Sequence, residues 1–307
     1  MISELKIGQK VHAAFLVRVN RIGISSNGKN FARGFLDDAS GQIGFICFDQ
    51  DAVEKLRSVE QPAPFVIAGS VDANKFSDDM KLQIVLQKVS DLMPEDDISH
   101  LLPVGDFDRD AYEAELKRYM GMIKQPVLGT LVKNLLQGAL YEQFLQNPAG
   151  MRLHHAYIGG LLQHSVNVTR LAVAMGDAIG DMDKDLIIAG ALLHDIGKVR
   201  EISSGMGFPY TTEGRLVGHI TMSVLMVQQQ ADALKMPAST LEQLMHILLS
   251  HHGDRENGSP VECETKEAFV VHYADELDAT INQFKPVRED TWSYNKMLQR
   301  YILDRKK

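Results

Sequence analysis

The sequence has little cysteine, no long apolar run and no excess of basic residues. Its two cysteines, Cys47 and Cys263, lie far apart and outside any CxxC pair, which excludes a disulfide framework or a zinc ribbon and favours a reducing cytoplasm. No window approaches about eighteen consecutive apolar residues and the first residues lack a signal-peptide pattern, so we expect neither membrane insertion nor export. A formal net charge of −8 argues against a broad basic surface for duplex nucleic acid.

What the chain does contain is enough apolar material for two domains, with 307 residues of which 45% are hydrophobic. Residues 1–92 consist of short apolar or alternating runs such as GQIGFICF and PFVIAGSV, separated by turn sequences such as SSNGKN. About five strands at this close spacing predict an OB-like β-barrel.

Beyond the predicted barrel the periodicity changes. Residues 93–108 place Pro94, Pro103 and Gly105 among acidic residues with no sustained period, which predicts a linker. Residues 109–307 carry apolar residues at helical spacing, and we expect an all-α bundle that continues through the aromatic C-terminal stretch.

Histidine is concentrated in the predicted helical domain, because nine of the eleven histidines lie between residues 154 and 272. Five of them and two aspartates lie on or at the ends of apolar helical segments: His164, His194, Asp195, His219, His251, His252 and Asp275. One histidine on an apolar face is usually a hydrogen-bonded core residue. Burying all seven groups in one bundle is costly unless divalent metal ions pair them. Nitrogen with carboxylate ligands suits Mn, Fe, Zn or Ni rather than Ca.

The order H…HD…H…HH…D resembles the ligand signature of binuclear HD-domain phosphohydrolases. The resemblance implies one metal on His164, His194, Asp195 and Asp275, a second on His219, His251 and His252, and Asp195 as the bridge.

Longer segments extend this resemblance over essentially the whole chain. HHAYIGGLLQHS, LLHDIGK, GHI, LSHHG and HYADELDA, behind an OB-like domain, are similar to the YhaM-type 3′–5′ exoribonucleases. That similarity implies 3′–5′ cleavage of single-stranded RNA with Mn²⁺, and leaves single-stranded DNA and Fe, Ni, Zn or Mg as alternatives. The text HHGDRENGSP lacks the Gly-Tyr-Pro motif of one group of cyclic di-GMP phosphodiesterases, and Gly160 stands where their third metal has an acidic ligand, so we expect two metals at most.

Catalysis by two divalent ions would need no nucleophilic side chain, because the ions activate water and stabilise the leaving oxygen. We expect Asp195 and Lys198 to be the catalytic residues, with Lys198 an electrostatic partner of the phosphate. A solvated lysine at a helix end is the alternative reading of Lys198.

Six basic residues and no acidic one lie between residues 5 and 36. We expect this stretch of the barrel to hold a single strand, and His154, His155 and Arg215 to contact nucleotide or phosphate in the helical domain. The predicted barrel contacts are Arg18, Arg21, Lys29 and Arg33, with Phe31 and Phe35 as stacking rings. For each of these residues, ordinary surface exposure or core packing is the alternative. A homo-oligomer is also expected.

Three other functions remain open from the residues alone. One is an HD enzyme acting on mononucleotides or cyclic nucleotides, which leaves the barrel without a role. A second is a di-iron oxygenase with the same ligands, and a third is a non-catalytic nucleic-acid-binding regulator with structural metals.

Overall fold

The computed structural model describes most of the chain, in two compact units. The described residues are 1–25, 27–58, 62–74, 82–93, 96, 99–102, 105–151, 155–205, 207–284, 287, 289–295 and 298–306. One unit comprises Met1–Val104 and Gly205–Gly207, and the other comprises Gly105–Ser204 and Phe208–Lys307. Pro94 and Pro103 of the predicted linker lie outside the described residues.

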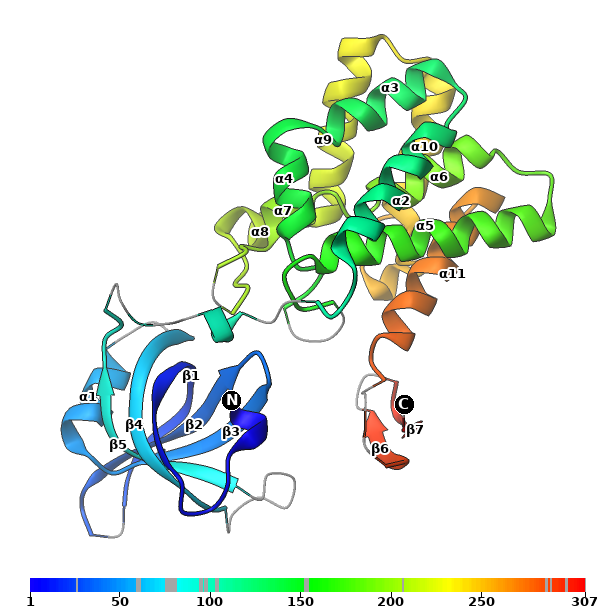
Figure 1. Cartoon of the computed structure of the whole chain (residues 1–307). Helices are drawn as coiled ribbons and strands as arrows, with labels where there is room; N and C mark the ends of the chain where they lie inside the picture. The colour runs from blue at the N-terminus through cyan, green and yellow to red at the C-terminus, as the bar shows by residue number, and fades with distance from the viewer. Residues whose placement is uncertain are drawn as a thin grey trace. The chain divides into compact units, whose positions relative to one another are not determined.

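The first unit is a closed five-stranded barrel, shown in Figure 1. Its elements are η1 (Ile2–Glu4), β1 (Lys10–Ile24), β2 (Asn30–Asp38), β3 (Gly41–Cys47), α1 (Gln50–Arg57), β4 (Ala63–Ala73), β5 (Leu82–Ser90) and η2 (Ser99–Leu101). The strand order is β1-β2-β3-β5-β4, with β4 closing on β1. Only the β3–β5 pair is parallel among the paired strands of the barrel that the structure describes. The OB-like barrel predicted from the sequence is confirmed.

Alternation along β2 explains both the barrel core and its outer face. Ala32 and Leu36 are fully buried, while Phe31, Arg33 and Phe35 on the opposite side of the strand are only partly buried. Since successive strand residues point to opposite faces, these three side chains share one outward face of the barrel.

The second unit is a helical bundle built around α5 and α6. Its elements are α2 (Arg109–Met122), α3 (Pro126–Leu135), α4 (Gly138–Gln146), α5 (Gly160–Ile179), α6 (Lys184–Leu193), α7 (Lys198–Glu201), α8 (Thr212–Val217), α9 (His219–Leu234), α10 (Ala238–Ser250), η3 (Arg255–Asn257) and α11 (Lys266–Ile281). Residues 186–193 of α6 are all buried, as expected of a helix that is apolar on every face. Pro126 occupies the first turn of α3, where its missing N–H costs nothing.

The end of the chain corrects one prediction. Instead of continuing as helix, it forms an antiparallel hairpin of β6 (Thr291–Asn295) and β7 (Arg300–Asp304), in which Tyr294 pairs with Tyr301. The aromatic and β-branched residues of TWSYN and RYILD favour strands, and their spacing over so short a stretch does not separate the two periods. None of the helices among the described residues is long and apolar enough to cross a membrane.

Candidate metal centre

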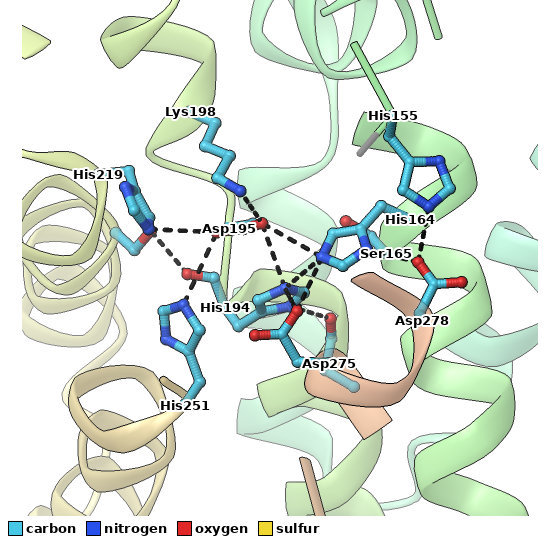
Figure 2. A network of polar contacts seen from close by, with 12 residues as sticks. His155, His164, Ser165, His194, Asp195, Lys198, His219, His251, Asp275 and Asp278 are labelled. Carbon is cyan, nitrogen blue, oxygen red and sulfur yellow. Dashed lines mark hydrogen bonds and ion pairs between the residues drawn. The ribbon is translucent and has the colours of Figure 1, made fainter. Parts of the chain in front are cut away.

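Five helices bring the seven predicted ligands together, as Figure 2 shows for six of them. His164 lies in α5 and Asp275 in α11. The other five stand at helix ends: His194 caps α6 and precedes Asp195, His219 opens α9, and His251 caps α10 and precedes His252. Helix ends direct these side chains into one buried space, where His164, His194 and His251 have no solvent exposure.

A first cluster comprises His164, His194, Asp195 and Asp275. His164 Nε2 lies 3.1 Å from Asp275 Oδ1 and 3.4 Å from Asp195 Oδ2. His194 Nε2 lies 3.3 Å from the same Asp195 oxygen and 3.2 Å from His164 Nε2. Two imidazole nitrogens and two carboxylates therefore face a common point.

The second cluster comprises His219, His251 and His252, whose ligand nitrogens lie within 4.8 Å of one another. Nε2 of His219 and Nε2 of His251 lie 3.5 and 3.8 Å from Asp195 Oδ1. Asp195 thus turns Oδ2 toward the first cluster and Oδ1 toward the second, which is the geometry of a bridging carboxylate.

Three atoms at the junction of the clusters have no hydrogen-bond partner in the described structure, although they are buried. They are Asp195 Oδ1, His219 Nε2 and His251 Nε2. An unsatisfied buried polar atom costs about 1–3 kcal/mol, and more if it is charged. Divalent cations would satisfy all three, so the residues present fit a two-metal centre.

In all five histidines Nδ1 makes a hydrogen bond to an oxygen atom that lies on the side of the ring away from the two clusters. The pairs are His164 with Asp278 Oδ2 at 2.7 Å, His194 with Ala191 O at 2.8 Å, His219 with Glu201 Oε1 at 2.9 Å, His251 with Leu248 O at 2.7 Å, and His252 with Asn257 O at 3.2 Å. Because carbonyl and carboxylate oxygens accept, each Nδ1 carries the proton and donates it. On a neutral ring this leaves Nε2 with a lone pair, the state that a metal ligand requires. Burial opposes a charge on His164, but Asp195, Asp275 and Asp278 hold its pKa well above the ordinary value, so a cation would have to displace a proton from its Nε2.

The charges of the site also favour cations. Burial opposes ionisation of Asp195, yet the neighbouring Lys198 and His194 hold the pKa of its carboxyl well below the usual value. Burial, together with the repulsion that a proton on His252 or His194 would exert, lowers the pKa of His251 well below its ordinary value, which keeps that ring neutral. An ionised bridge beside a neutral imidazole is the protonation state in which both can bind a metal.

The comparison with known families agrees with this geometry, because the HD domain family matches residues 161–280. These residues form an HD domain. The prediction of an HD phosphohydrolase domain is therefore confirmed. HD domains bind divalent metals, and the two clusters of this domain could hold such ions. The exoribonuclease activity, its substrate and the identity of the metal stay predictions.

Solved structures give weaker likenesses. The HD domain of the Listeria monocytogenes phosphodiesterase PgpH is 21% identical, with 50% of this chain and 78% of that chain covered and a TM-score of 0.31. Asparaginyl-tRNA synthetase of Entamoeba histolytica is 13% identical over 48% of this chain and 35% of that chain, at a TM-score of 0.23. The Pyrococcus horikoshii enzyme is 12% identical over 78% and 59%, also at 0.23. Because these TM-scores are low, we infer nothing about activity from these structures.

Lys198 opens the short helix α7 of the HD domain and points into the site. Its Nζ lies 2.6 Å from Asp195 Oδ2 and only 9% of its side chain is exposed, so the alternative of a solvated lysine is wrong. Burial opposes its charge, but the neighbouring Asp195 raises the pKa of Lys198 above its usual value. The side chain is an ammonium at neutral pH.

Three predicted contacts of the helical unit have different outcomes. His155 is 1% exposed and bonds Asp278 and Tyr157 through its two ring nitrogens, so both of its polar atoms are already occupied and its predicted contact with nucleotide or phosphate gains no support. Arg215 is exposed, with its guanidinium 5.7 Å from the centre of the Tyr210 ring. His154 lies outside the described residues.

Two carboxylates of the HD domain were missed from the sequence. Asp278 lies one turn after Asp275 on α11, and that spacing of three could have signalled it. Glu201 lies at the end of α7 and reaches His219 across a loop and α8, and no local pattern predicts such a contact.

In the barrel, some of the predicted contacts lie together. Arg21, Arg33 and Phe35 line a pocket of about 270 Å³. Lys29 is exposed in the β1–β2 loop, and the partly buried Phe31 ring lies 6.4 Å from that of the exposed Phe48.

Arg18 differs from the other predicted barrel contacts. Its Nε lies 2.9 Å from Asp37 Oδ2 as an ion pair, without the angle of a hydrogen bond, and both side chains are mostly buried. Because Asp37 offsets its charge, Arg18 is a weaker candidate for a nucleic-acid contact than the sequence indicated, and that contact stays a prediction. The sequence stretch that suggested it ends at residue 36, just before this acidic partner.

Proposed function

We propose that this chain is a metal-dependent phosphodiesterase that removes nucleotides from the 3′ end of single-stranded RNA. The observation that supports it most is that four histidines from four helices direct Nε2 toward the two oxygens of Asp195, with three buried atoms unsatisfied. Two divalent ions of the Mn²⁺ type held there would supply an activated water and stabilise the leaving oxygen.

The chain's own residues would prepare the site for this chemistry. Asp195 holds its two oxygens toward different clusters, and Asp275 and His164 complete the first one. The Lys198 ammonium, buried against Asp195, is placed to attract a substrate phosphate and to offset the negative charge that builds up on it. Helix α6, apolar and fully buried beyond its first turn, excludes water from one side of the centre.

The barrel supports a polymeric substrate rather than a small one. Arg21, Arg33 and Phe35 meet at one pocket on its outer face, which combines positive charge with an aromatic ring. Single strands bind to such surfaces by phosphate contact and base stacking. The 3′–5′ direction and the preference for RNA over DNA come from the resemblance of the sequence motifs.

The decisive experiment is a degradation assay with 5′-labelled single-stranded RNA and Mn²⁺. We expect a ladder that shortens from the 3′ end, and no ladder with Asp195→Asn at equal folding and concentration. Parallel reactions contain single-stranded DNA, a cyclic dinucleotide and a nucleoside monophosphate. Turnover of one of the small substrates with intact RNA would reject the proposal in favour of a nucleotide phosphohydrolase.

Two further arms separate the remaining alternatives. Oxygen uptake by the iron-loaded protein would favour a di-iron oxygenase. RNA binding without hydrolysis across Mn²⁺, Mg²⁺, Zn²⁺, Ni²⁺ and Fe²⁺ would favour a regulator with structural metals.

A further inference from the structure

Two of the five inward-facing histidines are held by carboxylates, and the other three by main-chain carbonyls. Asp278 holds His164 in the first cluster, and Glu201 holds His219 in the second. We propose that Asp278 and Glu201 are positioning residues that set the cation affinity of the two clusters separately. This inference rests on metal binding within the proposed function, but not on its substrate.

Asp278 is fixed through both of its oxygens. Oδ2 accepts from His164 Nδ1 and from His155 Nε2, each at 2.7 Å, and Oδ1 accepts from Asn167 Nδ2 at 2.9 Å. Only 11% of the side chain is exposed. With three donors around it the carboxylate has one orientation, and Figure 2 shows it beside the rings of His164 and His155. The plane of the His164 ring is thereby set.

Glu201 holds His219 by a different geometry. Its Oε1 accepts from both the main-chain N–H and the Nδ1–H of His219, each at 2.9 Å. Helix α8 packs closely on this residue, since a Cβ added at Gly214 would lie 2.3 Å from the carbonyl oxygen of Glu201. Ring and main chain of His219 are therefore oriented together, at the residue where α9 begins.

A carboxylate partner does more for a metal ligand than a carbonyl does. Its full negative charge polarises the Nδ1–H bond more strongly and makes Nε2 a better donor, and loss of such a partner typically costs about 10–100-fold in metal affinity. Asp278 hydrogen-bonds a ligand of the first cluster, and Glu201 hydrogen-bonds a ligand of the second. The two effects should therefore be separable.

The test is Mn²⁺ binding by the full-length protein without RNA, measured by titration calorimetry after chelation and by electron paramagnetic resonance. We expect two equivalents with a spin-coupled signal for the unaltered chain. Asp278→Asn should weaken one equivalent about 10–100-fold, Glu201→Gln the other, and the double variant both. At limiting Mn²⁺ each single variant should show the uncoupled signal of an isolated ion.

Two control variants test whether the loss of any nearby carboxylate lowers the Mn²⁺ affinity in the same way. Glu115→Gln removes an ion pair with Arg170 on α5, the helix of His164. Glu213→Gln removes one with Arg200 on α7, next to Glu201. Both controls should keep two equivalents of unchanged affinity. Equal loss in the controls, loss of both equivalents from either single variant, or no loss in either would overturn the inference.

A smaller change covers the case in which Asp278→Asn does not fold. Asn167→Ala leaves the Asp278 carboxylate in place and removes the hydrogen bond to its Oδ1, together with the bonds that Asn167 accepts from Tyr112 and Arg170. We expect a several-fold loss confined to one equivalent, and an unchanged isotherm would count against the inference. Separable Mn²⁺ binding with intact RNA would leave the inference standing and reject only the proposed substrate.

Discussion

Lys198 places an ammonium group against the carboxylate that the two clusters share. We expect Lys198→Met to lower kcat about 100-fold, because a charge aimed at the reacting phosphate is lost. Mn²⁺ affinity should not fall, because Asp195 loses a competing cation. Lys184→Met, which removes an exposed ion pair with Asp177, is the control and should leave kcat unchanged. Steady-state kinetics and metal content measured together decide this, and loss of Mn²⁺ from Lys198→Met would mean that the lysine is structural.

Gly160, the first residue of α5, is required by the close approach of the segment that precedes the helix. A Cβ at this position would lie 2.0 Å from the carbonyl oxygen of His155, which packs directly on the first turn of α5. Any side chain there would push His155 away from Asp278 and so disturb His164. We predicted at most two metals because position 160 has no acidic side chain. The packing of His155 on this position also explains why no side chain is present there.

Gly160→Ala should therefore destabilise the protein by about 1–3 kcal/mol, as overpacking does elsewhere. The control is Gly121→Ala in α2, where an added Cβ meets nothing within 4 Å. That change should stabilise the helix by about 0.5–1 kcal/mol because alanine loses less backbone entropy. Urea unfolding curves measure both, and equal effects of the two substitutions would contradict the packing argument.

At the scale of elements, the ion pair between Glu115 and Arg170 joins α2 to α5, and its contribution to the stability of the fold depends on pH. Arg170 of α5 donates to Glu115 of α2, and this hydrogen bond lowers the pKa of the Glu115 carboxyl below its usual value. Since the folded pKa lies below the unfolded one of about 4.3, the pair stabilises the folded state above that pH. The contribution is lost as the pH falls through the folded pKa.

Glu115→Gln tests this sign. Because Arg170 is half exposed, we expect the variant to be less stable by only about 0.5–1 kcal/mol between pH 5 and 7. The difference should shrink below about pH 4 as the unaltered chain also loses its ionised partner. Urea midpoints across this pH range measure it, and a difference that grew on acidification would reverse the assignment.

At the scale of the whole molecule, we predict that the barrel binds the RNA strand and that the HD domain hydrolyses it. Arg21→Ala with Arg33→Ala should raise KM for long RNA about tenfold and leave kcat nearly unchanged, because these residues would contact phosphates remote from the cleaved bond. Lys6→Ala with Lys10→Ala removes the same charge from elsewhere in the basic stretch and should change KM little. An equal rise in both double variants would indicate a general charge effect instead of a binding face.

The sequence by itself determined the barrel, the helices around the site and the residues that could bind metal. Alternation in β2 and helical spacing in α5 and α6 are local patterns, and local patterns follow from the backbone periods of 2 and 3.6 residues. Burying seven ionisable groups in one bundle has few explanations, so the donor set was also readable.

Only the tertiary structure decided what those residues face. Asp37 forms an ion pair with Arg18, and the buried His155 hydrogen-bonds Asp278 beside the candidate metal centre. Glu201 hydrogen-bonds His219, which follows it along the chain after α8. The aromatic C-terminal stretch forms β6 and β7 rather than a helix, because its strands pair with each other. The first three outcomes depend on partners well separated along the chain, and the hairpin depends on the pairing of two neighbouring strands. The local period carries no information about either kind of partner.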